Sequence, residues 1–225
     1  MTVENRDASY LTEKYSGQER ELWTPCLHTY FKQHKPTLPV RECVPGESSK
    51  FRDRRSAPKI AMTGEILLDP GYSFLEKIDK AFNVSLVNDP KRYVWRSRNG
   101  KRKKCDIAGF QPDIFLIDAK TKRVVIFENK PYEYSTLTGP QEQDYVDFVL
   151  WLQRKKIECE YLFVSPHEWT RRKFPALVKM QKTIPGSLGF IWYEDIFSKM
   201  AADGFDYAEL GKPWSDYTLL NPKIL

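Results

Sequence analysis

Long apolar runs are missing from this chain of 225 residues, and residues 1–7 show no signal-peptide pattern. A membrane-crossing helix needs about 20 consecutive, mostly apolar residues. A secretory leader has a basic, an apolar and a small-residue region in that order. We therefore expect a soluble intracellular protein, cytoplasmic in location, with no membrane partner.

Cysteine and glycine are also scarce. The four cysteines stand far apart, at positions 26, 43, 105 and 159, without a Cys-x-x-Cys pair. This argues against a disulfide-stapled secreted domain or a zinc ribbon. The chain has neither a glycine-rich phosphate loop nor a Gly-x-Ser-x-Gly motif, so it lacks the patterns of P-loop enzymes and of serine hydrolases.

What the chain does contain is ample material for a core, with 41% hydrophobic and 14% aromatic residues. A chain of this length suggests one domain with additions. We predict an α/β protein with a central mixed β-sheet flanked by helices. Its parts would be a partly irregular N-terminal extension at 1–58, a core at 59–166, and a C-terminal α/β addition at 167–225.

Hydrophobic periodicity and turn signals predict the elements of that core in order. The first are a helix at Thr63–Leu68, a helix from Ser73 through Phe82 opened by a Ser73–Glu76 capping box, a strand at Val84–Val87, and a hairpin of Arg92–Arg98 and Lys103–Phe110 around Asn99-Gly100. The next are strands at Asp113–Ile117 and Arg123–Phe127, a helix from Thr138 to about Lys156, and a strand at Tyr161–Val164 closed by Ser165-Pro166. The addition would hold a helix at Arg171–Lys182, a strand at Phe190–Tyr193 and a helix at Glu194–Ala202.

Positive charge is concentrated in the predicted hairpin. The net charge is only +6, but eight of the fourteen residues from 91 to 104 are basic. Such a cluster suits a polyanion, although a solvated hairpin tip would have the same composition. Aromatic residues among the cations favour nucleic acid, because bases stack on aromatic faces. The predicted nucleic-acid-binding residues are Arg92, Tyr93, Trp95, Arg96, Arg98, Lys101, Arg102, Lys103 and Lys104.

Two acids and a lysine carry the predicted chemistry. Asp113 begins one apolar strand, fourteen residues separate it from Glu128, and Lys130 follows at the end of the next strand. Glu128 and Lys130 share a strand face because side chains alternate, and the hairpin can bring Asp113 level with them. Two carboxylates at the end of a buried sheet need a counter-charge.

A divalent cation would supply that counter-charge. Mg²⁺, or Mn²⁺ in its place, prefers carboxylate oxygens together with water and substrate phosphate. A bound cation lowers the pKa of its water, while Lys130 would orient or help deprotonate that water and offset charge on the phosphate. The residues therefore predict phosphodiester hydrolysis.

At this point the sequence resembles a family. Pro112-Asp113, a hairpin, and Glu128-Asn129-Lys130 are similar to the motif of the PD-(D/E)XK nucleases, across about residues 60–166. The resemblance implies a restriction-endonuclease-like core, with Asp113 and Glu128 as metal ligands and Lys130 as the catalytic lysine. It also implies that the backbone carbonyl of Asn129 points at a metal.

Three further residue pairs bear on this resemblance. Gln141 and Tyr145 match the QxxxY pattern of RecB-like members, where they contact the DNA or the catalytic lysine. A capping role for Gln141 and a core role for Tyr145 are the alternatives. The family usually has an acid on its first helix, for which Glu65 and Glu76 both qualify. Ser73-x-x-Glu76 also resembles the first-helix motif of transposon-end nucleases.

The resulting expectation is a metal-dependent nuclease, acting on DNA rather than RNA. The alternative is a catalytically inactive protein of the nuclease fold, serving as a nucleic-acid-binding or partner-binding subunit. The resemblance is compatible with a homodimer or a larger protein complex.

Overall fold

The computed structural model describes residues 22–68, 73–98, 101–110, 112–132, 135–137 and 139–207. Its helices are α2 (Thr24–His34), α3 (Ser73–Phe82), α4 (Gly139–Arg154), α5 (His167–Thr183) and α6 (Tyr193–Ala202), with a 3₁₀ turn η2 (Pro90–Arg92). Its strands are β1 (Thr37–Pro39), β2 (Arg41–Cys43), β3 (Phe51–Asp53), β4 (Lys59–Ala61), β5 (Glu65–Leu68), β6 (Tyr93–Arg98), β7 (Lys101–Asp106), β8 (Ile114–Asp118), β9 (Arg123–Asn129), β10 (Glu158–Ser165) and β11 (Leu188–Trp192).

A seven-stranded mixed sheet forms the centre, in the order β3-β2-β11-β10-β9-β8-β5. Strands β9, β10 and β11 are parallel to one another, and the remaining pairs are antiparallel. The parallel pairs are joined by α4 and α5, because a parallel connection needs a crossover of a dozen or more residues. The predicted α/β class with a mixed sheet and flanking helices is confirmed.

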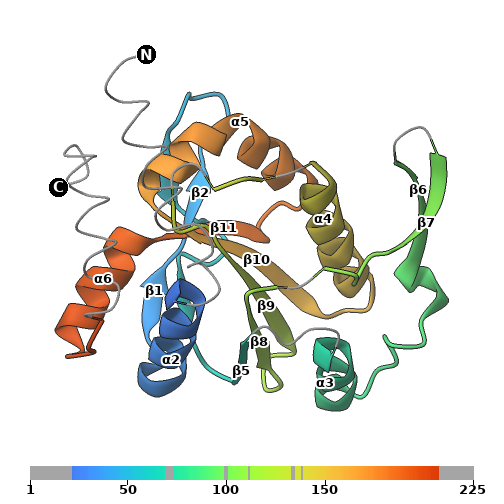
Figure 1. The fold of residues 1–225 in the computed structure, drawn as a ribbon, viewed down its shortest axis with the longest axis horizontal. Coiled ribbons are helices and arrows are strands. Elements are labelled where there is room, and N and C mark those ends of the chain that lie inside the picture. The colour runs from blue at the N-terminus through green and yellow to red at the C-terminus, as the bar shows by residue number, and fades with distance from the viewer. Residues whose placement is uncertain are drawn as a thin grey trace.

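Helices cover both faces of this sheet. One face packs against α3, α4 and α5 in a cluster that includes Ile126, Tyr161 and Phe163. The other packs against α2 and α6 in a cluster that includes Val125 and Leu162. Figure 1 shows the two helix layers on either side of the sheet. Strands buried on both faces read as nearly continuous apolar runs, which is why β8 and β9 were recognisable in the sequence.

The β6–β7 hairpin lies apart from the central sheet, as a separate two-stranded sheet that projects beyond α4 (Figure 1). Its register pairs Tyr93 with Asp106 and Arg98 with Lys101. The predicted hairpin is confirmed, with its return strand ending at Asp106. The Asn99-Gly100 turn itself lies outside the described residues, as does the Thr138 cap predicted for α4.

The helix predicted at Thr63–Leu68 is wrong, because residues 65–68 form the edge strand β5. Gly64 has φ +109°, a conformation that interrupts a helix and that glycine adopts readily. From there Glu65 pairs opposite Ile117 and Leu68 opposite Ile114. Four residues are too few for a stable isolated helix, so pairing with the apolar strand β8 determines their conformation.

The strand predicted at Val84–Val87 is also wrong. These residues follow α3 as irregular backbone that leads into a turn at Val87, and the backbone N–H groups of Leu86 and Val87 donate to the Asp79 carboxylate at 2.6 and 3.0 Å. The side chain of Asp79 thus takes the donors that a strand would offer to a neighbour.

The central sheet draws on all three predicted parts of the chain. Strands β2 and β3 come from the segment 1–58, β5, β8, β9 and β10 from 59–166, and β11 from 167–225. The three-part division stays a prediction. None of the helices in the described part of the chain is long and apolar enough to cross a membrane.

Candidate functional site

The end of β9 sends its side chains to opposite faces of the sheet. Glu128 and Lys130 point toward the α4 face, and Asn129 points toward α2 and α6. The side-chain Nδ2 of Asn129 donates to Thr24 Oγ1 at 3.0 Å, and its side-chain Oδ1 accepts from the Tyr193 hydroxyl. The side chain of Asn129 is therefore engaged on the far face, and the role implied for this residue concerned only its backbone carbonyl.

Asp113 stands one position before β8, beside Glu128. The last pair of the β8–β9 ladder is Ile114 opposite Phe127, so the next position in this register sets Asp113 opposite Glu128. The Asp113 carboxylate accepts a hydrogen bond from the backbone N–H of Asn129 at 2.7 Å. The β8–β9 register thus sets Asp113 and Glu128 side by side, as the sequence predicted.

Lys130 and Tyr145 both donate hydrogen bonds to Glu128. Lys130 Nζ donates to Oε1 at 2.7 Å, and the Tyr145 hydroxyl donates to Oε2. Glu128 is 4% exposed, Lys130 6% and Tyr145 1%. A buried charge is costly unless it is paired and hydrogen-bonded, and this arrangement meets both conditions.

Tyr161 on β10 lies against the same group. Its ring stacks on that of Tyr145, with centroids 4.3 Å apart. Burial raises the pKa of Tyr161 well above its usual value, and the neighbouring Tyr145, Glu128 and Asp113 raise it further. Residues opposite each other on antiparallel strands share a face of the sheet, so the register that sets Asp113 opposite Glu128 places both acids on the α4 side.

Sequence reasoning missed Tyr161 and Ser165 as parts of this site. Val164 pairs with Asn129, so the next position sets Ser165 beside Lys130. Ser165 is fully buried, and its hydroxyl has no hydrogen-bond partner within the described ranges. The only signal in the sequence was its position at the end of an apolar strand, where it was interpreted as a strand stop.

The two candidate first-helix acids stand on different elements. Glu65 is on strand β5 rather than on a helix. It pairs opposite Ile117, at the end of β8 that is far from Asp113. Its Oε1 lies 2.5 Å from Lys77 Nζ. Glu76 is exposed in the first turn of α3. The structure thus separates Glu65 from the Asp113–Glu128 position. Gln141 falls in the first turn of α4, and its side chain lies outside the described residues.

Within the ranges that the structure describes, no group of three or more His, Cys, Asp or Glu side chains is placed to hold a metal ion. A cation at this position would therefore rest on the two carboxylates Asp113 and Glu128, with the Asn129 carbonyl that the resemblance adds.

The basic hairpin residues divide into two groups. Arg92 pairs with Asp106 through two hydrogen bonds, and Arg96 pairs with Asp144 and Asp147 of α4. Four basic residues of the predicted set are exposed, Lys101, Arg102, Lys103 and Lys104, and so are the two aromatic residues Tyr93 and Trp95. The side chain of Arg98 is not among those described. Arg96 is thus a structural link to α4, which its sequence neighbours could not reveal.

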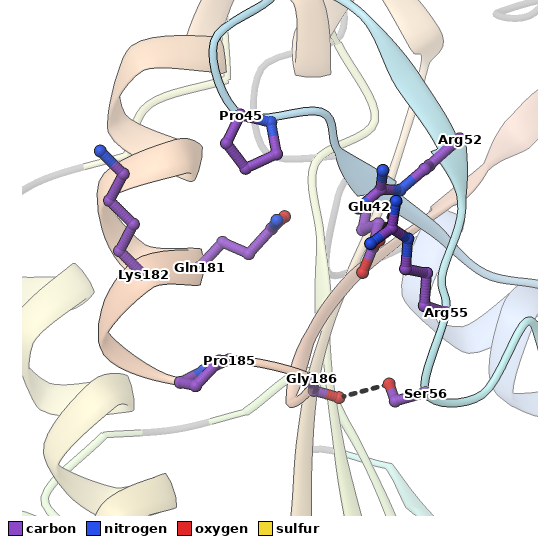
Figure 2. Close-up of a pocket in the computed structure, with 9 residues that line it drawn as sticks. All are labelled: Glu42, Pro45, Arg52, Arg55, Ser56, Gln181, Lys182, Pro185 and Gly186. Atoms are coloured by element: carbon purple, nitrogen blue, oxygen red, sulfur yellow. Dashed lines mark hydrogen bonds and ion pairs between the residues drawn. The ribbon is translucent and has the colours of Figure 1, made fainter.

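A separate pocket of about 350 Å³ lies between the segment 42–56 and the C-terminal end of α5. Figure 2 shows Arg52 and Arg55 across from Gln181. Arg52 Nε lies 2.7 Å from Glu42 Oε1, and the Ser56 hydroxyl donates to the Gly186 carbonyl at 3.1 Å. Strand β2 at this pocket is three strands from β9 in the sheet, so the pocket is distinct from the Glu128 site.

Comparison of the chain with models of protein families, with curated proteins and with solved structures found no match.

Proposed function

We propose that the protein is a metal-dependent nuclease that hydrolyses phosphodiester bonds in DNA. The observation that carries the proposal is the position shared by Asp113 and Glu128 at the end of the β8–β9 hairpin, with Lys130 on the same face. Strands β8 and β9, the crossover helix α4 and the parallel strand β10 support a restriction-endonuclease-like core around this position.

The donor set suits Mg²⁺ or Mn²⁺. Asp113 and Glu128 offer hard carboxylate oxygens, and the charges of these two side chains and Lys130 sum to −1, which a divalent cation would offset. A bound cation would polarise the phosphodiester and lower the pKa of its water.

The residues of the chain have separable tasks in this proposal. Tyr145 fixes one oxygen of Glu128, so the carboxylate keeps one orientation. The Asn129 N–H fixes Asp113. Lys130 brings a positive charge to the same strand end, where it would offset negative charge on the scissile phosphate. The exposed cations of the hairpin would supply affinity that does not depend on sequence.

Lys130→Ala tests this division of tasks. We expect cleavage of plasmid and linear DNA in Mg²⁺ to fall at least a hundredfold, because a charge placed at the developing transition state is lost. DNA affinity should change less than threefold. Lys120→Ala is the matched control, since this exposed lysine lies in the turn at the other end of the same hairpin. Equal loss of binding and cleavage would mean that Lys130 is a phosphate anchor or a structural residue.

One observation favours a second candidate, a catalytically inactive nuclease-fold subunit that binds nucleic acid or a protein partner. Glu128 and Lys130 bond directly to each other and are more than nine-tenths buried, an arrangement that a purely structural ion pair would also show. Under this candidate the protein cuts no DNA in Mg²⁺ or Mn²⁺, and Lys130→Ala alters stability alone.

A further inference from the structure

The two long faces of the β6–β7 hairpin have different surroundings. Side chains alternate along each strand, so one face carries Val94, Arg96 and Lys103. Val94 packs against the core, and Arg96 is only 13% exposed at its side chain, bound to Asp144 and Asp147 of α4. This is the inner face of the hairpin, and it fixes the hairpin beside α4.

The outer face carries two large aromatic rings that are exposed. Trp95 is 60% exposed and Tyr93 43%. They lie two residues apart on one strand, hence on one face and roughly 7 Å apart. Figure 1 shows the hairpin projecting from the body beside α4, so the outer face is turned away from the helix that holds the inner one.

Cations lie over both rings. Lys104 Nζ is 4.6 Å from the centroid of Tyr93, and Arg102 Cζ is 5.4 Å from the centroid of Trp95. Exposed aromatic rings with cations beside them match the two parts of a nucleic-acid strand, a flat base and a phosphate. A base that stacks on a ring can displace the cation from it, and the cation then meets the neighbouring phosphate.

We propose that this outer face is a binding platform for single-stranded DNA, with unpaired bases stacked on Tyr93 and Trp95 and phosphates contacted by Arg102 and Lys104. Bases in a duplex are stacked on one another and cannot offer their faces to the rings. The platform therefore gives the protein a preference for DNA with an unpaired segment. The choice of DNA as the ligand rests on the proposed nuclease function, but the platform itself is tested by binding measurements alone.

The test uses the full chain in EDTA with two fluorescent oligomers of equal length, an oligothymidylate and an abasic strand that has the same phosphates and no bases. The wild type should bind the oligothymidylate more tightly. Trp95→Ala should weaken that binding about tenfold, as loss of one stacked base does, and leave the abasic strand unaffected. Trp95→Phe should retain most of the affinity. Thermal unfolding should not change, because Trp95 is exposed.

Lys103→Ala is the matched control on the inner face. It removes a phosphate contact at most, so it should weaken both oligomers by the same factor. The platform is wrong if Trp95→Ala weakens both oligomers equally or neither, or if an oligouridylate of the same length binds more tightly than the oligothymidylate.

The two proposals fail in different ways. If the wild type binds oligothymidylate through Trp95 yet cuts no DNA, the nuclease proposal falls and the platform stands. If the protein cuts DNA and Trp95→Ala changes no affinity, the platform falls and the nuclease proposal stands.

Discussion

Tyr145 connects the candidate site to helix α4. Its hydroxyl donates to Glu128, its ring stacks on Tyr161, and Phe110 packs edge-on against it at 4.6 Å between centroids. The QxxxY resemblance implied that Tyr145 contacts DNA or Lys130, and the alternative was a core aromatic. The structure shows a buried ring whose hydroxyl donates to Glu128, the ion-pair partner of Lys130, so the polar end of the ring meets a buried acceptor.

Tyr145→Phe should therefore destabilise the protein. The change keeps the ring and removes the donor, so a buried carboxylate loses a hydrogen bond, at a cost of about 1.5–3 kcal/mol. Urea unfolding measures this loss as a lower midpoint with an unchanged slope. Tyr93→Phe is the control at an exposed phenol and should change nothing. An unchanged midpoint for Tyr145→Phe would show that the hydroxyl does not hold Glu128.

At the scale of elements, Asp89 ties the base of the hairpin to α4. Its carboxylate accepts from the backbone N–H of Lys91 at 2.9 Å, from Trp151 Nε1 at 3.0 Å and from Lys155 Nζ at 2.6 Å. Burial alone would raise its pKa, but Lys155, the Lys91 N–H and Trp151 outweigh burial and lower the pKa of Asp89 to about 2.

This pKa predicts a pH window for stability. A carboxyl group whose folded-state pKa lies below the ordinary value of about 3.9 stabilises the fold above that value, and the contribution is lost as the pH falls toward 2. Asp89→Asn should therefore lower the thermal midpoint at pH 7, and the difference from wild type should shrink between about pH 4 and pH 2. A difference that stays constant over this range would contradict the charged role of Asp89.

Most elements of the core could be predicted from the sequence, because β8, β9 and β10 are apolar runs and α3 has an apolar face. The errors at residues 63–68 and 84–87 share one cause. Both are short segments whose conformation depends on partners outside the segment, β8 for the first and the Asp79 side chain for the second. Local propensity does not contain those partners.

The candidate site was predictable for the same reason as the core strands. Glu128 and Lys130 share a face by alternation alone, and the hairpin set the position of Asp113. Ser165 and Tyr161 were not predictable as site residues because they belong to β10, and the sequence does not say which strand lies beside β9. The ion pairs of Arg96 depended likewise on how the hairpin docks against α4.

In the whole molecule, helix α4 links the Asp113–Glu128 position at the end of the central sheet to the projecting β6–β7 hairpin. On this helix, Tyr145 donates to Glu128, while Asp144 and Asp147 bind Arg96 of the hairpin. One helix thus orients a carboxylate of the candidate site and anchors the basic hairpin.

The proposed nuclease activity is tested by cleavage of supercoiled plasmid with the purified full chain, wild type and Glu128→Gln, in Mg²⁺ and in EDTA. We expect nicked or linear product for the wild type in Mg²⁺ alone, and at least a hundredfold less for Glu128→Gln, because the amide keeps the shape but cannot supply a carboxylate to the cation. Product that forms equally in EDTA, or equally with Glu128→Gln, would contradict the proposed activity.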